Sequence, residues 1–435
     1  MSLKTVLRLG LFQFCLGMLS LLNYGLLNRV MVIELGISLA ATSFIVSAHY
    51  FAAPISLPIG HLSDRRSYFG YRRTPYIVAG AALTAVLTAL APFLALHIAG
   101  QGTSLATTLL GAVYFLVMGA GIYVAATAYI SLVTDLTVEE ERGKVVSIIW
   151  TLMMLGILTG AGLTAMTMAH YDENRFTAIF GGMSVVLALL TAAALWRMEK
   201  RLDQQGKALL QSQGARGNLR QAMGLVTSNP QARRFFAFLT MALFFFFTQE
   251  VVLEPFGGQV FDLEVRETTL FNAYQMVGVL AGMLLSGQFL ANKWGKKKTT
   301  AMGIAMGVGA FSLLTLSAAG QWKILLHPGI VALGLALGFF NVGGLSLMMN
   351  MSTAERAGLF MGAWSLAQAL ARGFSGVLGG VVRDVTLALG VSLPLSFAAV
   401  FGLEALGLLV ILRILQGISI REFHSRAVEL EQVLQ

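Results

Sequence analysis

The sequence predicts an all-α integral membrane protein with twelve transmembrane helices. Of its 435 residues, 56% are hydrophobic and only 12% are charged, whereas soluble domains carry about 25% charged residues. Its mean hydropathy is +0.75. A helix needs about 20 apolar residues to cross the hydrocarbon layer of a bilayer, and stretches of that length recur along nearly the whole chain. The composition therefore excludes an ordinary soluble globular domain.

Twelve apolar stretches are long enough to span the membrane as helices. Six precede a long polar segment and six follow it. We expect the first to be a retained span and not a signal peptide, because no small-residue cleavage site follows it. The spans are expected near residues 8–28, 38–60, 75–97, 107–133, 145–168, 176–196, 234–254, 268–290, 299–319, 328–350, 357–382 and 391–413.

The polar segment in the middle of the chain divides it into two predicted bundles. Residues 1–196 are predicted to form an N-terminal six-helix bundle and residues 234–413 a C-terminal one. The segment 197–233 is then a cytoplasmic linker, and 414–435 is a cytoplasmic tail.

Lysine and arginine gather on one side of the predicted spans. Placing both termini in the cytoplasm leaves only five basic residues on the opposite side: Arg29, Arg175, Arg266, Lys323 and Arg383. This asymmetry agrees with the positive-inside rule. It also accounts for the net charge of +9 through membrane topology, so no nucleic-acid partner is expected.

The two halves repeat each other at two places. Gly60 to Arg73 follows the second span, and Gly287 to Lys298 follows the eighth. Glu141-Arg142 follows the fourth span, and Glu355-Arg356 follows the tenth. In both of these last cases a tryptophan comes eight residues after the arginine. The halves are therefore predicted to be parallel six-helix repeats.

The loop after span two carries a pattern of glycine, aspartate and arginine, which consists of Gly60, Asp64, Arg65, Gly70, Arg72 and Arg73. It resembles the cytoplasmic signature loop of the major facilitator superfamily, although its second glycine follows the aspartate by six residues in place of the usual three. This form is similar to that of the bacteriochlorophyll delivery (PucC/LhaA-like) family, as are the runs 27–35 and 249–261.

The resemblance implies a major facilitator fold and a membrane-embedded assembly factor. Such a protein would bind or deliver chlorophyll or bacteriochlorophyll, as cargo, while light-harvesting or photosystem complexes are built. The implied partners are the lipid bilayer, subunits of those complexes and pigment-synthesis enzymes. The implied location is a bacterial inner, intracytoplasmic or thylakoid photosynthetic membrane. The alternative, which the wider superfamily implies, is a small-solute transporter working by alternating access.

Resemblance to the superfamily also implies a conformational latch in this loop. Asp64 would face the cytoplasmic start of span eleven near residues 357–360, where the positive end of the helix dipole stabilises a carboxylate. The alternative is that the loop only supplies topological charge. The second-half copy has Ala291 in place of the aspartate, so a latch there should be weaker.

Polar residues at membrane depth are the candidate binding residues, because they are costly to bury and rarely idle. The pigment-binding candidates are His49, Asn272, Gln275, Glu250 and Glu254. His49 could be an axial ligand of a chlorophyll magnesium, or it could simply be hydrogen-bonded to a neighbouring helix. Glu250 and Glu254 could bind a ligand, or they could cap a turn at 255–258.

Two further charges lie within the predicted spans. Arg372 in span eleven could contact a substrate, or it could form a structural ion pair with Glu404 in span twelve. Spans one, four, five and six have no acidic residue near their middles, which weakens the case for a proton-coupled transporter. The chain also lacks a phosphate-binding loop, Gly-x-Ser-x-Gly and His-Glu-x-x-His, so we expect no enzyme activity, no catalytic residue and no metal site.

Glycines four residues apart predict close contacts between helices, because small residues let two backbones approach. The chain has five such pairs: Gly156/Gly160, Gly278/Gly282, Gly303/Gly307, Gly334/Gly338 and Gly376/Gly380.

Overall fold

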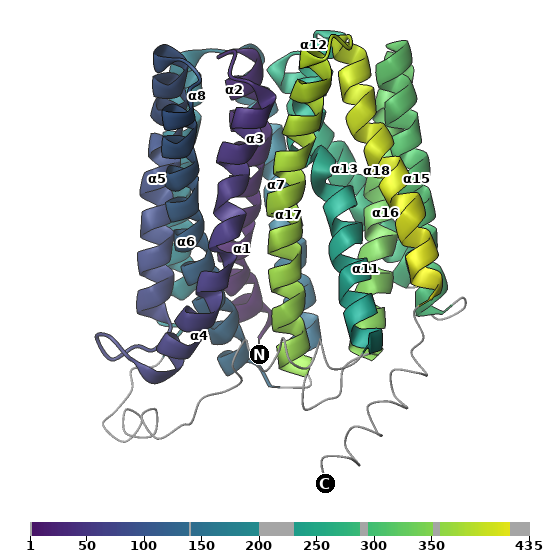
Figure 1. Cartoon of the computed structure of the whole chain (residues 1–435). Coiled ribbons are helices and arrows are strands. Elements are labelled where there is room, and N and C mark those ends of the chain that lie inside the picture. Colours follow the sequence, from purple (N-terminus) through teal and green to yellow (C-terminus); the bar gives the residue numbers. More distant parts are fainter. Residues whose placement is uncertain (1, 139–140, 200–229, 288–294, 351–356, 418–435) are drawn as a thin grey trace. The chain divides into compact units, whose positions relative to one another are not determined.

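The protein is a helical bundle divided into two compact units (Figure 1). This computed structural model describes residues 2–138, 141–199, 230–287, 295–350 and 357–417. Of these residues, the first unit contains those up to 199 together with 257–273, and the second contains 230–256 and those from 274 onward. The predicted linker lies largely outside the described residues and the predicted tail almost entirely so, and the predicted domain boundaries stay a prediction.

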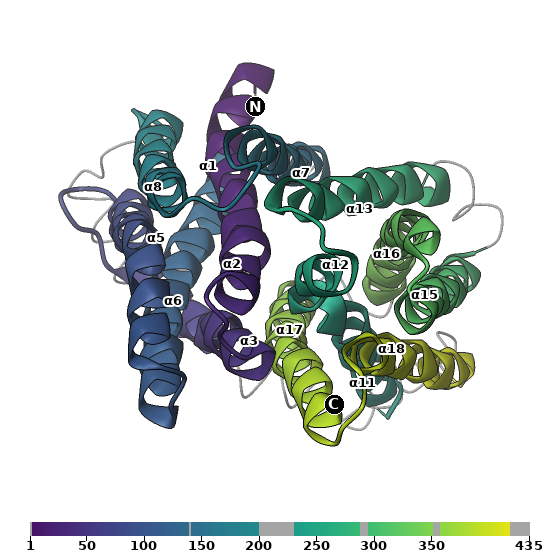
Figure 2. The ribbon, with the colours of Figure 1, turned by 90° about the horizontal axis from the view of Figure 1, so that it is seen from above.

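The first unit contains most of the predicted spans one to six. Its elements are α1 (Leu3–Leu21), a π-helical segment η1 (Leu22–Leu27), α2 (Asn28–Ile33), α3 (Leu39–Ser47), a 3₁₀ segment η2 (Ala48–Ile55), α4 (Ser56–Arg65), α5 (Thr74–Gln101), α6 (Leu105–Leu136), α7 (Arg142–Thr167) and α8 (Glu173–Leu195). Seen from above, α1 lies beside α7 and α8, and α5 lies beside α6 (Figure 2).

The second half of the chain is built in the same way. Its elements are α11 (Pro230–Phe247), a 3₁₀ segment η4 (Thr248–Val251), α12 (Leu253–Phe261), α13 (Val265–Leu285), α15 (Lys296–Gly320), α16 (Lys323–Asn350), α17 (Ala357–Ala388) and α18 (Leu393–Gln416). Among the described residues, a bridge between Tyr68 and Tyr71 is the only β-type pairing. The helices are those expected from the apolar stretches.

Eleven helices of the described residues are long and apolar enough to cross a membrane. They correspond to the predicted spans one to ten and twelve. The predicted span eleven is α17, which has 32 residues and is long enough. It carries Arg372, Arg383 and Asp384, and these charges reduce its hydropathy.

Spans one, two and seven are each interrupted by a segment that is not α-helical. Span one changes to a π-helix at Leu22–Leu27, and span two changes to a 3₁₀ helix at Ala48–Ile55, which contains Pro54. Span seven changes to a 3₁₀ helix at Thr248–Val251. The apolar pattern of the sequence predicts each of these spans as one continuous stretch. Such interruptions are frequent at functional sites.

Glycines allow the helices of each unit to pack closely, as predicted. A side chain at Gly156 of α7 would overlap the Phe14 carbonyl oxygen of α1. A side chain at Gly278 of α13 would lie 3.0 Å from the Gly334 Cα of α16, and one at Gly282 would lie 3.1 Å from the Gly338 Cα. At these positions the backbones touch, and any larger residue would separate the helices.

The segment 257–273 belongs to the first unit because of contacts at one end of that bundle. Arg29 of α2 is buried and donates from Nη2 to the Leu263 carbonyl oxygen at 3.0 Å. Its Nη1 pairs with Glu34 at 2.7 Å. The charge pattern of the sequence predicts only that Arg29 lies on the side with few basic residues, and it does not indicate this anchoring role.

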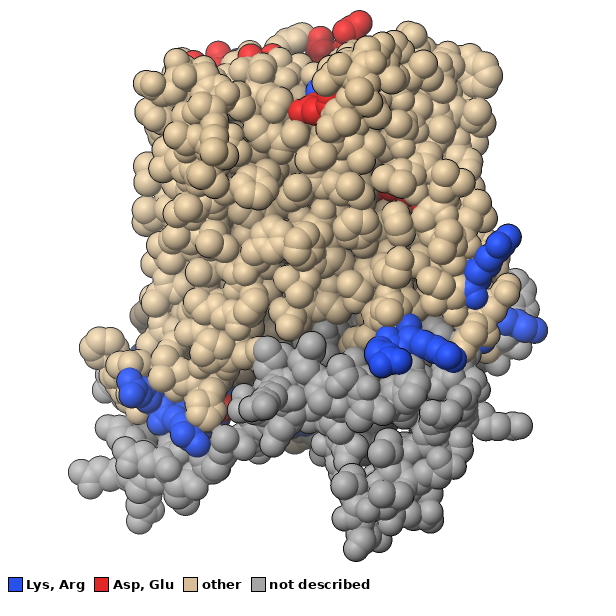
Figure 3. All heavy atoms as spheres, viewed as in Figure 1, with Lys and Arg blue, Asp and Glu red and all other residues tan. Residues whose placement is uncertain are grey.

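Charged side chains lie mainly at the ends of the helices. On the face shown in Figure 3, most of the visible Lys and Arg lie toward the lower end of the view, and most of the visible Asp and Glu lie at the upper edge. The tan surface between these ends has almost no charge. This distribution is the one expected of a protein that crosses a bilayer.

Candidate functional site

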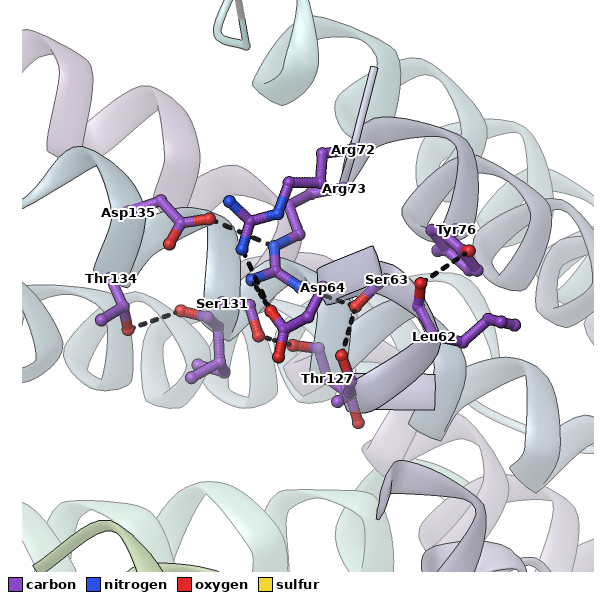
Figure 4. A network of polar contacts seen from close by, with 12 residues as sticks. Leu62, Ser63, Asp64, Arg72, Arg73, Tyr76, Thr127, Ser131, Thr134 and Asp135 are labelled. Atoms are coloured by element: carbon purple, nitrogen blue, oxygen red, sulfur yellow. Dashed lines mark hydrogen bonds and ion pairs between the residues drawn. The ribbon is translucent and has the colours of Figure 1, made fainter. Parts of the chain in front are cut away.

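The end of α4 and the loop after it form a charged network in the first unit (Figure 4). Asp64 lies in the last turn of α4. Its Oδ1 accepts from Arg73 Nη2 at 2.5 Å and from Arg72 Nη2 at 3.1 Å. Arg65, the neighbour of Asp64 in sequence, is exposed at the end of the helix. The two arginines that follow Gly70 are therefore the ones that orient the aspartate.

Arg73 connects this network to two other parts of the unit. Its Nη1 donates to Ser63 Oγ at 2.7 Å, and its Nε donates to Asp135 Oδ2 of α6 at 3.1 Å. The arginine side chain is only 4% exposed, whereas Asp64 and Asp135 are about two-fifths exposed. One buried guanidinium thus holds the end of α4 against the end of α6.

The loop between Asp64 and Arg72 folds into a tight turn. Tyr68 and Tyr71 exchange both backbone hydrogen bonds at 2.9 Å. Phe69 and Gly70, the two residues inside the turn, have φ of 55° and 82°. Both angles lie in the left-handed region that glycine adopts readily. The extra residues between Asp64 and Gly70 form this turn and bring Arg72 and Arg73 back to the aspartate. Gly60 lies inside α4, where an added Cβ would be in ordinary van der Waals contact with Thr127.

Glu199, which lies four residues after the end of α8, also belongs to the network. Its Oε1 accepts from the backbone N–H groups of Arg72 at 2.7 Å and Arg73 at 2.9 Å, and its Oε2 accepts from Thr74 at 2.7 Å. Thr74 begins α5, whose first N–H groups have no partner within the helix. A carboxylate here satisfies three donors and lies at the positive end of the helix dipole. Glu199 therefore caps α5 from a position 125 residues away.

The predicted latch between Asp64 and residues 357–360 is not tested by the structure. Those residues belong to the second unit, and their side chains lie outside the description. In the second-half copy of the loop, residues 288–294, which include Ala291, lie outside the described residues. The latch stays a prediction, while the contacts of Asp64 within its own unit are established.

His49 lies in the interrupted part of span two and contacts the interrupted part of span one. The imidazole is 7% exposed. Its Nδ1 lies 2.7 Å from the Val46 carbonyl oxygen, which makes Nδ1 the donor, and its Nε2 lies 2.6 Å from the Tyr24 hydroxyl. Tyr24 and Tyr50 stack with their ring centroids 5.5 Å apart. This geometry favours the structural reading of His49, since both ring nitrogens are engaged in hydrogen bonds.

Glu250 in η4 contacts Arg372 of α17, with Oε1 and Nη1 3.6 Å apart. Of the two alternatives for Arg372, an ion pair with Glu404 is therefore wrong, because the glutamate that Arg372 contacts is Glu250. Arg372 also lies over the ring of Phe247, 3.9 Å from its centroid, and this contact with α11 holds the guanidinium beside η4. Glu404 of α18 is fully buried, and neither of its carboxylate oxygens has a hydrogen-bond partner among the described residues.

The predicted turn at 255–258 is also wrong, because these residues lie inside α12 (Leu253–Phe261). Pro255 is the third residue of that helix. A proline in the first turn removes no helical hydrogen bond, since the N–H groups there have no partner within the helix. Glu254 is 2% exposed in the same turn. Glu250 and Glu254 belong to two separate helical segments and not to one continuous face.

Asn272 and Gln275 lie one turn apart on α13, and both are half-buried. The boundary between the two compact units falls between them, after Ala273. Among the described residues, no three His, Cys, Asp or Glu side chains come together as a metal site would require.

Three residues of these networks were missed by the sequence analysis: Tyr24, Asp135 and Glu199. Asp135 and Glu199 are acidic residues at the ends of spans four and six that the positive-inside rule predicts to be cytoplasmic, and acidic residues are unusual on a strongly basic side. Acidic residues among many basic ones were therefore the feature of the sequence that could have identified Asp135 and Glu199. Tyr24 had no comparable signal, because a tyrosine in an apolar helix is common.

Comparison with known proteins identifies the family. A family model described as PUCC protein matches residues 26–423. This chain belongs to the PucC family. PucC proteins are photosynthesis-related membrane proteins, so the resemblance seen in the loop and in the runs 27–35 and 249–261 is confirmed.

Two relatives illustrate the match. The chain is 32% identical over 390 residues to protein PucC of Rhodovulum sulfidophilum. The aligned region covers 88% of this chain and 86% of that protein. It is 30% identical over 422 residues to a Rhodobacter capsulatus protein named bacteriochlorophyll synthase 44.5 kDa chain. The aligned region covers 95% of each of the two chains.

Solved structures confirm the predicted major facilitator fold. The nucleoside transporter NupG matches with a TM-score of 0.68 at 16% identity, over 96% of this chain and 99% of that one. A bacterial homolog of the human lysosomal transporter Spinster matches with a TM-score of 0.69 at 14% identity, over 97% of both chains. The chain is therefore an integral membrane protein with twelve transmembrane helices in two parallel six-helix repeats.

Proposed function

We propose that this protein is an assembly factor that binds (bacterio)chlorophyll and delivers it while light-harvesting or photosystem complexes are built. The observation that carries the proposal is the PucC family match over residues 26–423, which includes both repeats. Its partners are then subunits of those complexes and the enzymes that make the pigment. Its location is the photosynthetic membrane, with both termini in the cytoplasm.

The polar groups of the spans support pigment binding better than catalysis. A chlorophyll ring is a large apolar disc with a few carbonyl groups, and apolar pockets with a few placed polar groups suit such ligands. We propose no enzyme activity, although one relative's name contains the word synthase.

A test of this proposal is to purify the full chain from a host that makes the pigment and extract what accompanies it. A major facilitator transporter of another family, expressed in the same host, controls for pigment dissolved in carried-over lipid. We expect pigment in a fixed ratio to this protein and only trace amounts with the control. Equal pigment-to-lipid ratios in the two preparations would contradict pigment binding.

Transport of a small solute by alternating access is the second candidate function. It is supported by the likeness of the fold to NupG and to the Spinster homolog, at 16% and 14% identity. It would be favoured if the purified protein carries no pigment but its stability rises when a small polar solute is added.

A further inference from the structure

Glu404 is a carboxyl group in the middle of a transmembrane helix. It is the twelfth of the 24 residues of α18 (Leu393–Gln416). Its side chain is fully buried, and both carboxylate oxygens lack a hydrogen-bond partner among the described residues. The backbone amide of Gln249 approaches the carboxylate without completing a hydrogen bond.

An ionised carboxylate in this position would be very unfavourable. Burying an unpaired ion in an apolar interior costs so much that the group instead takes up a proton and becomes neutral. A neutral carboxylic acid loses only the hydrogen bonds that it would otherwise make with water. The environment of Glu404 therefore holds it as the neutral acid.

No described cation compensates Glu404 from the elements that pack on α18, which are α15, α11, α17 and η4. On α15 and α11 the only charged residues lie in the first turns, at the cytoplasmic end. On η4 the only charged residue is Glu250. On α17, Arg372 pairs with Glu250, and Arg383 pairs with Asp384 at 2.6 Å. The charged groups of these elements are Lys296, Lys297, Lys298, Arg233, Arg234, Glu250, Arg372, Arg383 and Asp384.

Glu404 is nevertheless close to a part of the bundle that can respond to its charge. The Gln249 amide that approaches it belongs to η4, the 3₁₀ interruption of span seven. The next residue, Glu250, holds Arg372 across that interruption. A negative charge on Glu404 would attract both the Gln249 N–H and the guanidinium of Arg372, and it would repel Glu250.

We propose that Glu404 is a proton-binding site that controls the conformation of η4. With the proton bound, Arg372 pairs with Glu250, as in this structure. When the O–H bond of Glu404 breaks and the proton passes to water, the negative charge remains on the carboxylate. Gln249 and Arg372 then turn toward Glu404, and the contact between Arg372 and Glu250 opens. This proton binding is separate from pigment binding.

Infrared spectroscopy of the purified full-length protein in lipid nanodiscs tests the protonation directly. A protonated carboxylic acid has a C=O stretching band that a carboxylate lacks. We expect this band at neutral pH in the unmodified protein and its loss in Glu404→Gln. Glu254→Gln tests the other buried glutamate, and Glu173→Gln is a matched control at an exposed position. A band that is absent from the unmodified protein, or that survives in Glu404→Gln, would overturn the proposal.

Hydrogen exchange at residues 248–252 tests the coupling to η4. After correction for the chemical dependence of exchange on pH, we expect protection of these amides to change as Glu404 loses its proton. The change should be absent in Glu404→Gln, which stays neutral. If Glu404→Gln folds poorly, the pH series of hydrogen exchange on the unmodified protein is the deciding measurement. Protection at residues 248–252 that stays constant over the pH range in which the infrared band disappears would contradict the coupling.

Discussion

The Arg73 guanidinium lies between two carboxylates, 2.5 Å from Asp64 Oδ1 and 3.1 Å from Asp135 Oδ2. Asp64 ends α4 and Asp135 lies near the end of α6, so this one side chain joins two spans that are separate in sequence. The aspartate of the loop pattern is thus part of a network within the first unit, whatever contact it makes elsewhere.

Replacing Arg73 with alanine should destabilise the first unit. Hydrogen bonds to charged groups contribute about 1.5–3 kcal/mol each, and Arg73 makes three of them to side chains. Because Asp64 and Asp135 are partly exposed and can be rehydrated, we expect a total loss of about 2–3 kcal/mol. Thermal unfolding in detergent measures it. Arg66→Ala, at an exposed position in the same loop, should change little, and equal losses in both variants would contradict the bridging role.

Glu199→Ala should loosen the start of α5. Loss of a helix cap costs about 0.5–2 kcal/mol, and here three backbone donors lose their acceptor. Hydrogen exchange of the amides of residues 72–74 should rise while exchange in the middle of α5 stays slow. Glu173→Ala provides an exposed acidic control. Unchanged protection at 72–74 would show that water replaces the cap without cost.

Gly156→Ala should push α7 away from α1, because the added Cβ would overlap the Phe14 carbonyl oxygen. Overpacking of this kind costs about 1–3 kcal/mol. Gly162→Ala on the same helix is a matched control, since its added Cβ meets nothing within 4 Å. The melting temperature of the first variant should fall clearly below that of the second. Similar melting temperatures would mean that the two helices separate easily.

His49→Leu and Tyr24→Phe distinguish the two readings of the histidine. If His49 is only structural, each variant loses a hydrogen bond worth about 0.6 kcal/mol on average in membrane proteins, and co-purified pigment is unchanged. If His49 binds the pigment magnesium, His49→Leu should lose pigment or shift its absorption to the blue, while Tyr24→Phe should keep it. We expect the structural result, because both ring nitrogens already have partners.

Cysteine labelling tests the membrane orientation. With the single native Cys15 replaced by serine, cysteines introduced at Ser2 and at Glu173 should react with a membrane-impermeant reagent from opposite sides of the membrane. Ser2 is then expected to face the cytoplasm, as the positive-inside rule requires. Reaction of both from one side would contradict the topology.

Much of the fold could be predicted from the sequence, because bilayer thickness and the repeat pattern leave few alternatives. Helices were found at all twelve predicted spans, and the glycine contacts followed from spacing alone. The interruptions in spans one, two and seven could not be predicted, since hydropathy does not distinguish an α-helix from a π or 3₁₀ segment. The sequence predicts a turn at 255–258 because its pattern does not show that a new helix begins at Leu253.

The candidate site was predicted less completely. The loop pattern identified Asp64, Arg72 and Arg73, but not their partners Asp135 and Glu199, which lie 62 and more than 125 residues from them along the chain. Charges at the ends of different helices can pair in many combinations, and composition does not select one. The same ambiguity explains why an ion pair between Arg372 and Glu404 was one of the two alternatives considered, whereas Arg372 contacts Glu250.

Transfer of pigment to an acceptor is the most direct test of the central claim. The purified protein, loaded with bacteriochlorophyll in nanodiscs, would be mixed with light-harvesting polypeptides in separate nanodiscs, and the red-shifted absorption of assembled complexes would be followed over time. The account predicts faster assembly from the loaded protein than from nanodiscs holding the same amount of pigment in lipid alone. Equal rates of assembly from the two sources would contradict delivery.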